Sequence, residues 1–191
     1  DIPVIILSDK NLSESSANTR DFSKENEEKV ESLKPKPGMG QKIKLYNSYE
    51  HNEEGFSVEG SEESKKATDL RLKKTNEILK SMPKVNLFGS NRAKKIIVAW
   101  GSTKGAILEA LKGMENKEDY AFLQIRGMWP LDPKIGQIIN AFKEKILIEN
   151  NASGQLETLL KSQMTVEFTK RIIKYDGRPF FPEEIKEALN D

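Results

Sequence analysis

The sequence predicts an α/β fold with a parallel sheet, preceded by a largely irregular and helical connecting arm. From residue 94 onward, apolar runs of strand length alternate with polar loops and amphipathic helices. That alternation is typical of a parallel sheet covered by helices on both faces and joined by right-handed crossovers. Before residue 94 the chain is highly charged and interrupted by prolines and glycines, so it offers little to a core.

The first strand and helix are predicted between Lys94 and Met114. Five consecutive apolar residues, Ile96 to Trp100, indicate a buried strand. A helix follows, with its apolar face formed by Ala106, Ile107, Ala110, Leu111 and Met114. In the turn between them Gly101 can adopt a positive φ, and Ser102 or Thr103 can cap the helix.

The start of this helix could hold an anion. Its free N–H groups, with Lys104 beside them, suit a phosphate or carboxylate at the positive end of the helix dipole. The loop from Gly101 to Gly105 has neither P-loop spacing nor the dinucleotide Gly-x-Gly-x-x-Gly pattern. We therefore favour a strand-to-helix turn whose glycines serve packing alone, and keep anion binding as the alternative.

Two more strand and helix units follow. Residues 120–125 predict a second strand, after which Asp132 is placed to cap a helix that starts at Pro133. Residues 145–149 predict a third strand, and a polar loop leads from there into a third helix carrying Leu156, Leu159 and Leu160. A fourth strand passes through Ile172 and Ile173, and Pro182 begins a short last helix.

In a parallel sheet, ligands and partners meet the loops at the carboxyl ends of the strands. Three such loops, residues 101–105, 126–131 and 150–155, should converge there. Their polar members, together with the first glycine, are our candidate substrate-side or interface residues: Gly101, Ser102, Thr103, Lys104, Arg126, Asn150, Asn151 and Gln155. This edge is rich in donors but has no obvious general base, so it suits binding or docking better than chemistry. We assign no catalytic residue to it.

The composition excludes several functions. Thirty-one basic and 30 acidic residues give a net charge of +1, so no global field attracts nucleic acid or a membrane surface. Without cysteine, the chain cannot supply a disulfide, a cysteine-held cluster or a cysteine nucleophile. The one histidine, His51, stands among Glu50, Glu53 and Glu54, where a solvated loop is a better interpretation than a metal site. We predict no metal ligand in this chain.

The region before the sheet falls into two parts. Residues 1–9 contain the apolar run Ile2 to Leu7, which predicts a buried strand that needs neighbours lying upstream of Asp1. Residues 10–93 predict a connecting arm, with a linker at residues 34–40, a charged helix near 61–82 and a hinge at 85–91. No apolar run reaches the length of a membrane span and no leader is recognisable, so we expect a cytoplasmic protein.

Four short motifs, in this order and spacing, resemble a known family. They are Trp100-Gly-Ser-Thr-Lys-Gly, the loop with Arg126 and Trp129-Pro130, Glu149-Asn-Asn-Ala-Ser-Gly-Gln-Leu, and Tyr175-Asp-Gly-Arg-Pro-Phe. Together they look like the end of the alpha subunit of 2-oxoacid:ferredoxin oxidoreductases. The resemblance implies that residues 94–191 form a transketolase C-terminal-like domain and that residues 1–9 end an upstream pyrimidine-binding domain.

The resemblance also implies an activity for the complete enzyme. Such enzymes decarboxylate a 2-oxoacid, join the acyl group to coenzyme A and pass electrons through an iron–sulfur cluster to ferredoxin, using thiamine diphosphate and magnesium. The expected partners are the rest of the alpha subunit and a beta subunit that carries thiamine and the cluster. This chain would supply subunit interface and support. The alternatives are a stand-alone α/β module for a nucleotide or small anion, and an interaction protein without an enzyme as partner.

Overall fold

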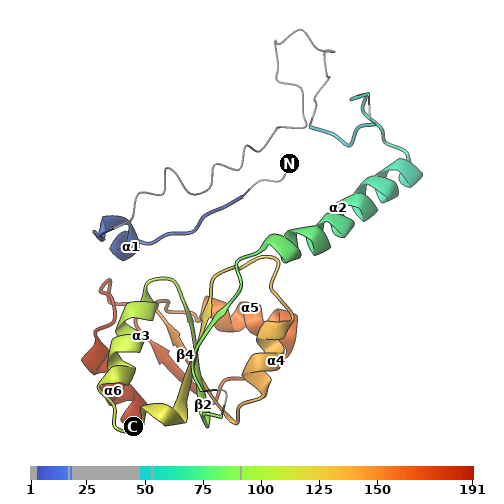
Figure 1. The fold of residues 1–191 in the computed structure, drawn as a ribbon. Helices are drawn as coiled ribbons and strands as arrows, with labels where there is room; N and C mark the ends of the chain where they lie inside the picture. The colour runs from blue at the N-terminus through green and yellow to red at the C-terminus, as the bar shows by residue number, and fades with distance from the viewer. Residues whose placement is uncertain (1–3, 17, 19–47, 53, 91) are drawn as a thin grey trace. The chain divides into compact units, whose positions relative to one another are not determined.

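The computed structural model describes residues 4–16, 18, 48–52, 54–90 and 92–191 (Figure 1). The chain divides into two compact units. One consists of Asp1–Ile6 and Ser16–Ile78, and the other of Leu7–Ser15 and Leu79–Asp191. The predicted linker at residues 34–40 lies outside the described residues.

The second unit contains a five-stranded sheet in the order β1-β3-β2-β4-β5. The strands are β1 (Asn86–Gly89), β2 (Lys95–Trp100), β3 (Tyr120–Ile125), β4 (Glu144–Glu149) and β5 (Lys170–Ile173). Strands β3, β2, β4 and β5 run parallel, and β1 pairs antiparallel with β3 at one edge. The predicted α/β class with a parallel sheet is confirmed.

The hinge predicted at residues 85–91 is wrong, because residues 86–89 form the edge strand β1. Leu87 pairs with Leu123 and Gly89 with Ala121, more than 30 residues ahead in the chain. A strand of four residues carries little periodic signal, and its pairing partner is not visible locally. Gly89 ends this strand with a φ of +82°, a conformation that glycine adopts readily.

Helices cover both faces of the sheet (Figure 1). On one face, α3 (Thr103–Lys112) packs beside α6 (Pro182–Asn190), and their buried residues Ile107, Ala110, Ile185 and Leu189 join one core cluster. On the other, α4 (Lys134–Asn140) and α5 (Gln155–Met164) contribute Ile135, Ile139, Leu156 and Leu160 to a second cluster. Alternate residues of β2 serve the two clusters, Ile96 and Val98 in one and Ile97 and Ala99 in the other. This two-faced burial explains why the strand reads as continuously apolar.

The described part of the N-terminal segment forms no strand. Residues 4–9 lack regular structure, and the side chains from Val4 to Leu7 are 60 to 86% exposed. Nothing in the described chain covers this apolar run, and the predicted buried strand depends on neighbours upstream of Asp1, so it stays a prediction. A short helix, α1 (Lys10–Glu14), follows, and the Asp9 side chain caps it by accepting from the Leu12 N–H at 2.9 Å.

The charged helix predicted near 61–82 is confirmed as α2 (Ser61–Ser81). Glu62 and Glu63 lie in its first turn and Lys80 in its last, which complements the helix dipole at both ends. Over its full described length no residue is buried. Among the described helices, none combines the length and apolar character needed to cross a membrane.

Candidate functional site

The sheet register brings the predicted loops together. Trp100 at the end of β2 lies opposite Ile125 at the end of β3, and β4 pairs in parallel on the other side of β2. The loops after these three neighbouring strands therefore leave the sheet at one edge, as the sequence predicts. The loop after β5 joins them, since Ile173 pairs with Glu149 at the ends of β5 and β4.

Within the first loop, the predicted helix cap is wrong. Ser102 occupies the N-cap position but accepts no bond from the helix. Thr103 is buried, and its hydroxyl donates to the Trp100 carbonyl oxygen at 2.8 Å. Gly101 does adopt a positive φ, of +66°, as predicted. The loop is thus closed by a bond back to the strand and not by a capping side chain.

A carboxylate of the same chain lies at this turn. The Oδ2 of Asp9 is 3.8 Å from the position that a Cβ on Gly101 would take. Burial tends to raise the pKa of Asp9, but hydrogen bonding from Ser102, Leu12 and Asn11 holds that pKa below its usual value. This carboxylate belongs to residues 7–15 of the same compact unit.

The two cations of the predicted site face different surroundings. The Lys104 ammonium lies 5.5 Å from the ring centroid of Phe88 on β1, a cation–π distance. Arg126 directly follows β3 and is exposed. The ammonium of Lys104 is thus directed at the edge strand, while Arg126 is open to solvent.

The loop after β4 is stabilised by its own polar side chains. Asn150 donates from Nδ2 to the carbonyl oxygens of Lys174 and Arg178, at 3.4 and 3.2 Å. Asn151 accepts at Oδ1 from the N–H and hydroxyl of Ser153, at 2.9 and 2.8 Å. These bonds tie the loop to its neighbour after β5 and fold it into an Asx turn. Gln155, the first residue of α5, is exposed.

Our sequence reasoning missed Glu149 as a member of this edge. It ends β4, is 1% exposed, and both of its carboxylate oxygens accept from the Leu156 N–H, at 3.1 and 3.2 Å. Trp100 ends the neighbouring strand β2, in which Val98 lies opposite Leu147 of β4. Burial raises the pKa of Glu149, and hydrogen bonding from the Leu156 N–H and the Trp100 side chain opposes that rise. A carboxylate directly after the apolar run Ile146 to Ile148 was the available signal.

A second buried carboxylate lies nearby on α5. Glu157 is 7% exposed and pairs with Arg171 of β5 and with Lys161, each at 2.8 Å. The Arg171 guanidinium approaches Gly154 so closely that a Cβ there would lie 2.6 Å from one of its nitrogens. The edge therefore holds two buried acids, of which Glu157 is paired with cations and Glu149 only with neutral donors.

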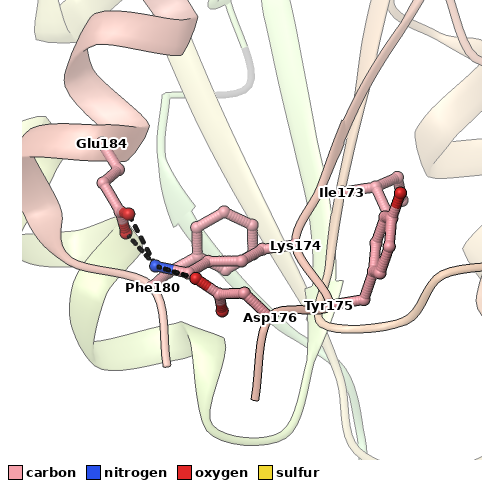
Figure 2. A pocket seen from close by; sticks show the side chains of 6 residues that line it. All are labelled: Ile173, Lys174, Tyr175, Asp176, Phe180 and Glu184. Atoms are coloured by element: carbon pink, nitrogen blue, oxygen red, sulfur yellow. Dashed lines mark hydrogen bonds and ion pairs between the residues drawn. The ribbon is translucent and has the colours of Figure 1, made fainter. Parts of the chain in front are cut away.

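The loop after β5 forms a shallow pocket of about 410 Å³, lined by Ile173, Lys174, Tyr175, Asp176, Phe180 and Glu184 (Figure 2). The Lys174 side chain is 11% exposed, and its ammonium contacts both Glu184 oxygens at 2.6 and 2.7 Å and Asp176 at 3.8 Å. The hydrogen bond from Lys174 and that from the Phe181 N–H lower the pKa of Glu184. Because the one cation is already matched by two carboxylates, the pocket is poorly suited to an anion.

The described residues around His51 do not form a set of metal ligands. The His51 ring is exposed, with Nδ1 3.2 Å from the Tyr49 carbonyl oxygen, and His51 forms a single bridge with Ser57. Within the described part of the chain, no three histidine or acidic side chains gather in a way that could hold a metal ion.

These observations define a class of protein: a mostly parallel α/β domain whose loop edge is closed by its own polar contacts. No family model matches the chain. The solved 2-oxoglutarate:ferredoxin oxidoreductase from Magnetococcus marinus, with 2-oxoglutarate, coenzyme A and succinyl-CoA bound, shares the fold. Its TM-score is 0.73 at 22% identity, over 81% of this chain and 27% of that one.

Two curated relatives are similar in sequence to this chain. The alpha subunit of 2-oxoacid:ferredoxin oxidoreductase from Saccharolobus solfataricus is 37% identical over 75% of this chain and 24% of its own length. Subunit alpha of enzyme 1 from Sulfurisphaera tokodaii is 30% identical over 82% of this chain and 25% of its own. The chain belongs to the family of 2-oxoacid:ferredoxin oxidoreductase alpha subunits and spans about a quarter of the length of these relatives. The resemblance carried by the four motifs is confirmed.

Proposed function

We propose that this chain works within the alpha subunit of an enzyme that oxidatively decarboxylates a 2-oxoacid, forms an acyl-CoA and reduces ferredoxin. The observation that carries the proposal is its identity of 30 to 37% with such subunits over three quarters or more of the chain. Coenzyme A as the acyl acceptor is supported by the ligands named for the Magnetococcus enzyme. The proposal includes a cytoplasmic location for the complex.

Within that enzyme, we assign residues 94–191 the tasks of building a subunit interface and bracing the neighbouring cofactor domain. Residues 1–9 would end the upstream pyrimidine-binding domain, and residues 10–93 would form the connecting arm. The exposed apolar run from Val4 to Leu7 supports this assignment, because such a run calls for a partner surface. The rest of the alpha subunit and a beta subunit carrying thiamine and the cluster are the proposed partners.

The cofactors of the complete enzyme do not fit the residues of this chain. The sequence has no cysteine for an iron–sulfur cluster, and the described residues gather no acidic set for magnesium. Thiamine diphosphate supplies the carbanion-stabilising chemistry when it is bound elsewhere in the enzyme. We therefore derive no chemical step for this chain, and place its contribution in docking and support.

The contacts of the edge weigh against the alternative of a stand-alone anion-binding module. Thr103 donates to the Trp100 carbonyl oxygen, Asn150 donates to two backbone carbonyls, and Asn151 is used in a turn. Donors already bonded within the chain would have to give up those bonds to hold a ligand. A docking edge needs no such exchange.

Co-purification tests the proposal. A tag after Asp191 should recover, under native conditions and in fixed ratio, a thiamine- and cluster-bearing subunit, with 2-oxoacid-dependent and coenzyme A-dependent reduction of ferredoxin. A lone 191-residue species without this activity would overturn it.

Alanine variants test the edge. Ser102→Ala, Thr103→Ala and Asn151→Ala should each lower assembly or turnover of the complex, whereas Ser162→Ala, whose hydroxyl only bonds its own helix, should not. Unchanged assembly and turnover in all three would remove the edge from the proposed function.

A further inference from the structure

Glu149 lies where two loops of the candidate edge leave the sheet. Its strand, β4, pairs with β2 up to Val98 and Leu147, so Trp100 and Glu149 lie two residues further on, at neighbouring strand ends. Trp100 is the last residue of β2, directly before the loop of residues 101–105, and Leu156 is the second residue of α5, directly after the loop of residues 150–154. One side chain thus accepts a hydrogen bond from one loop end and lies beside the other.

The helix α5 depends on this side chain for its capping. Its N-cap is Gly154, which has no side chain and a φ of +67°, so it cannot satisfy the free N–H groups of the first turn. Glu149 satisfies the Leu156 N–H from five residues before the cap, on a neighbouring element. A serine or threonine at the N-cap normally satisfies such N–H groups without burying a charge, but the positive φ of Gly154 and the Arg171 guanidinium beside it leave no place for a side chain here.

The choice of a carboxylate here carries a cost. Glu149 is buried without a cation bonded to it, and a buried charge is destabilising unless its partners compensate. A cap alone does not need that cost. What a two-oxygen acceptor adds is room to accept also from the Trp100 indole on the neighbouring strand, whose hydrogen bonding lowers the pKa of this carboxylate.

We propose that Glu149 is a positioning residue whose carboxylate couples the loop after β2 to the start of α5 and so sets the spacing of the candidate edge. Its effect on turnover rests on the proposed function, whereas the coupling itself does not. Three charged groups belong to the same surroundings: Glu157 on α5, Arg171 on β5, and Lys161, which pairs with Glu157.

Tryptophan fluorescence of the 191-residue chain can test the coupling. The sequence has two tryptophans, and Trp129 is 65% exposed on another loop, so Trp129→Phe leaves Trp100 as the single reporter. We expect Trp100 emission in this variant to titrate with a midpoint above the usual glutamate range. Adding Glu149→Gln should abolish the titration. A titration that survives E149Q but vanishes with Glu157→Gln, or no titration at all, would overturn the coupling.

Amide hydrogen exchange gives a second readout. Glu149→Leu should accelerate exchange of the Leu156 amide about tenfold, because it removes a charge-assisted hydrogen bond. Amides of residues 101–105 should also shift or exchange faster, while E149Q, which keeps one acceptor, should partly restore Leu156. The matched control is Glu144→Gln at the exposed start of the same strand, where the carboxylate pairs with Lys95 at 3.3 Å. Changes confined to α5 would mean a simple cap and overturn the proposal.

If both Glu149 variants fail to fold, the coupling can still be tested in Trp129→Phe. The hydrogen exchange of the Leu156 amide and the Trp100 emission are then both followed as a function of pH. Both signals should shift with one common midpoint, and two unrelated midpoints would overturn the coupling. In the assembled enzyme, E149Q should lower turnover while E144Q does not. If E149Q abolishes the Trp100 titration but leaves turnover unchanged, the coupling is supported. The proposed role of the edge in the enzyme is then contradicted.

Discussion

The helices α2 and α3 show how differently two parts of this chain are stabilised. The 21 residues of α2 include none that is buried, and its order is supported by charges placed to suit the helix dipole. The 10 residues of α3 bury Thr103, Ile107 and Ala110 against a sheet that is itself fully covered. Helical pattern alone therefore does not say whether a segment contributes to the core.

The largest contrast should come from removing an apolar side chain in each region. Phe122 is fully buried in β3 and stacks on Phe88 with ring centroids 5.4 Å apart. Phe122→Ala should lower the free energy of unfolding by about 3 to 5 kcal/mol in urea denaturation, because it leaves a large cavity. Leu72→Ala in α2, where the side chain is 64% exposed, should stay within about 0.5 kcal/mol. Similar losses in both variants would show that α2 belongs to the core.

Two glycines sharpen the contrast within the sheet unit. Gly89 and Gly177 both have a φ of +82°, but a Cβ at Gly89 would lie 2.7 Å from the Tyr120 carbonyl oxygen, whereas nothing lies within 4 Å at Gly177. Gly177→Ala should cost about 1 kcal/mol for backbone strain alone. Gly89→Ala should cost roughly 2 to 4 kcal/mol, because overpacking against the backbone adds to that strain. If thermal unfolding shows the same loss of stability for both variants, the backbone of β1 is not closely packed against Tyr120.

A smaller effect is expected at the loop after β5. Because Lys174 lowers the folded-state pKa of Glu184 below its usual 4.5, the pair stabilises the fold above that value. The contribution is lost as the pH falls through the lowered pKa. Glu184→Gln should therefore unfold at lower urea than the parent at pH 7, and the difference should shrink towards pH 3. A difference that does not change with pH would mean the pair contributes through packing alone.

The smallest effect on the sheet unit should follow from breaking α2 itself. Lys73→Pro removes a helix hydrogen bond in the middle of α2, at a local cost of about 3 kcal/mol, so the far-ultraviolet helix signal should fall. The unfolding transition reported by Trp100 and Trp129 should stay where it is, and Lys73→Ala should change neither signal. A shifted transition in the proline variant would show that the two regions are coupled.

Local patterns were sufficient for much of the fold. The run Ile96 to Trp100 predicted β2, Pro182 marked the start of α6, and the charged segment near residues 61–82 predicted α2. These signals work because periodicity, capping and ring constraints act within a few residues. They also located the loops that form the candidate edge.

What the side chains of that edge do was decided by tertiary structure. The sequence allowed Ser102 to cap its helix and kept anion binding beside Lys104 as an alternative to packing alone. In the structure the Ser102 side chain makes no cap bond, and the Lys104 ammonium faces the Phe88 ring. The edge strand β1 and the bonds of Glu149 depend on residues brought together from separate elements. The sequence by itself determined the strands, the helices and the end of the sheet where the loops gather, because those follow from local rules. Only the packed chain decided which donors are already bonded, because that depends on distances between residues far apart in sequence.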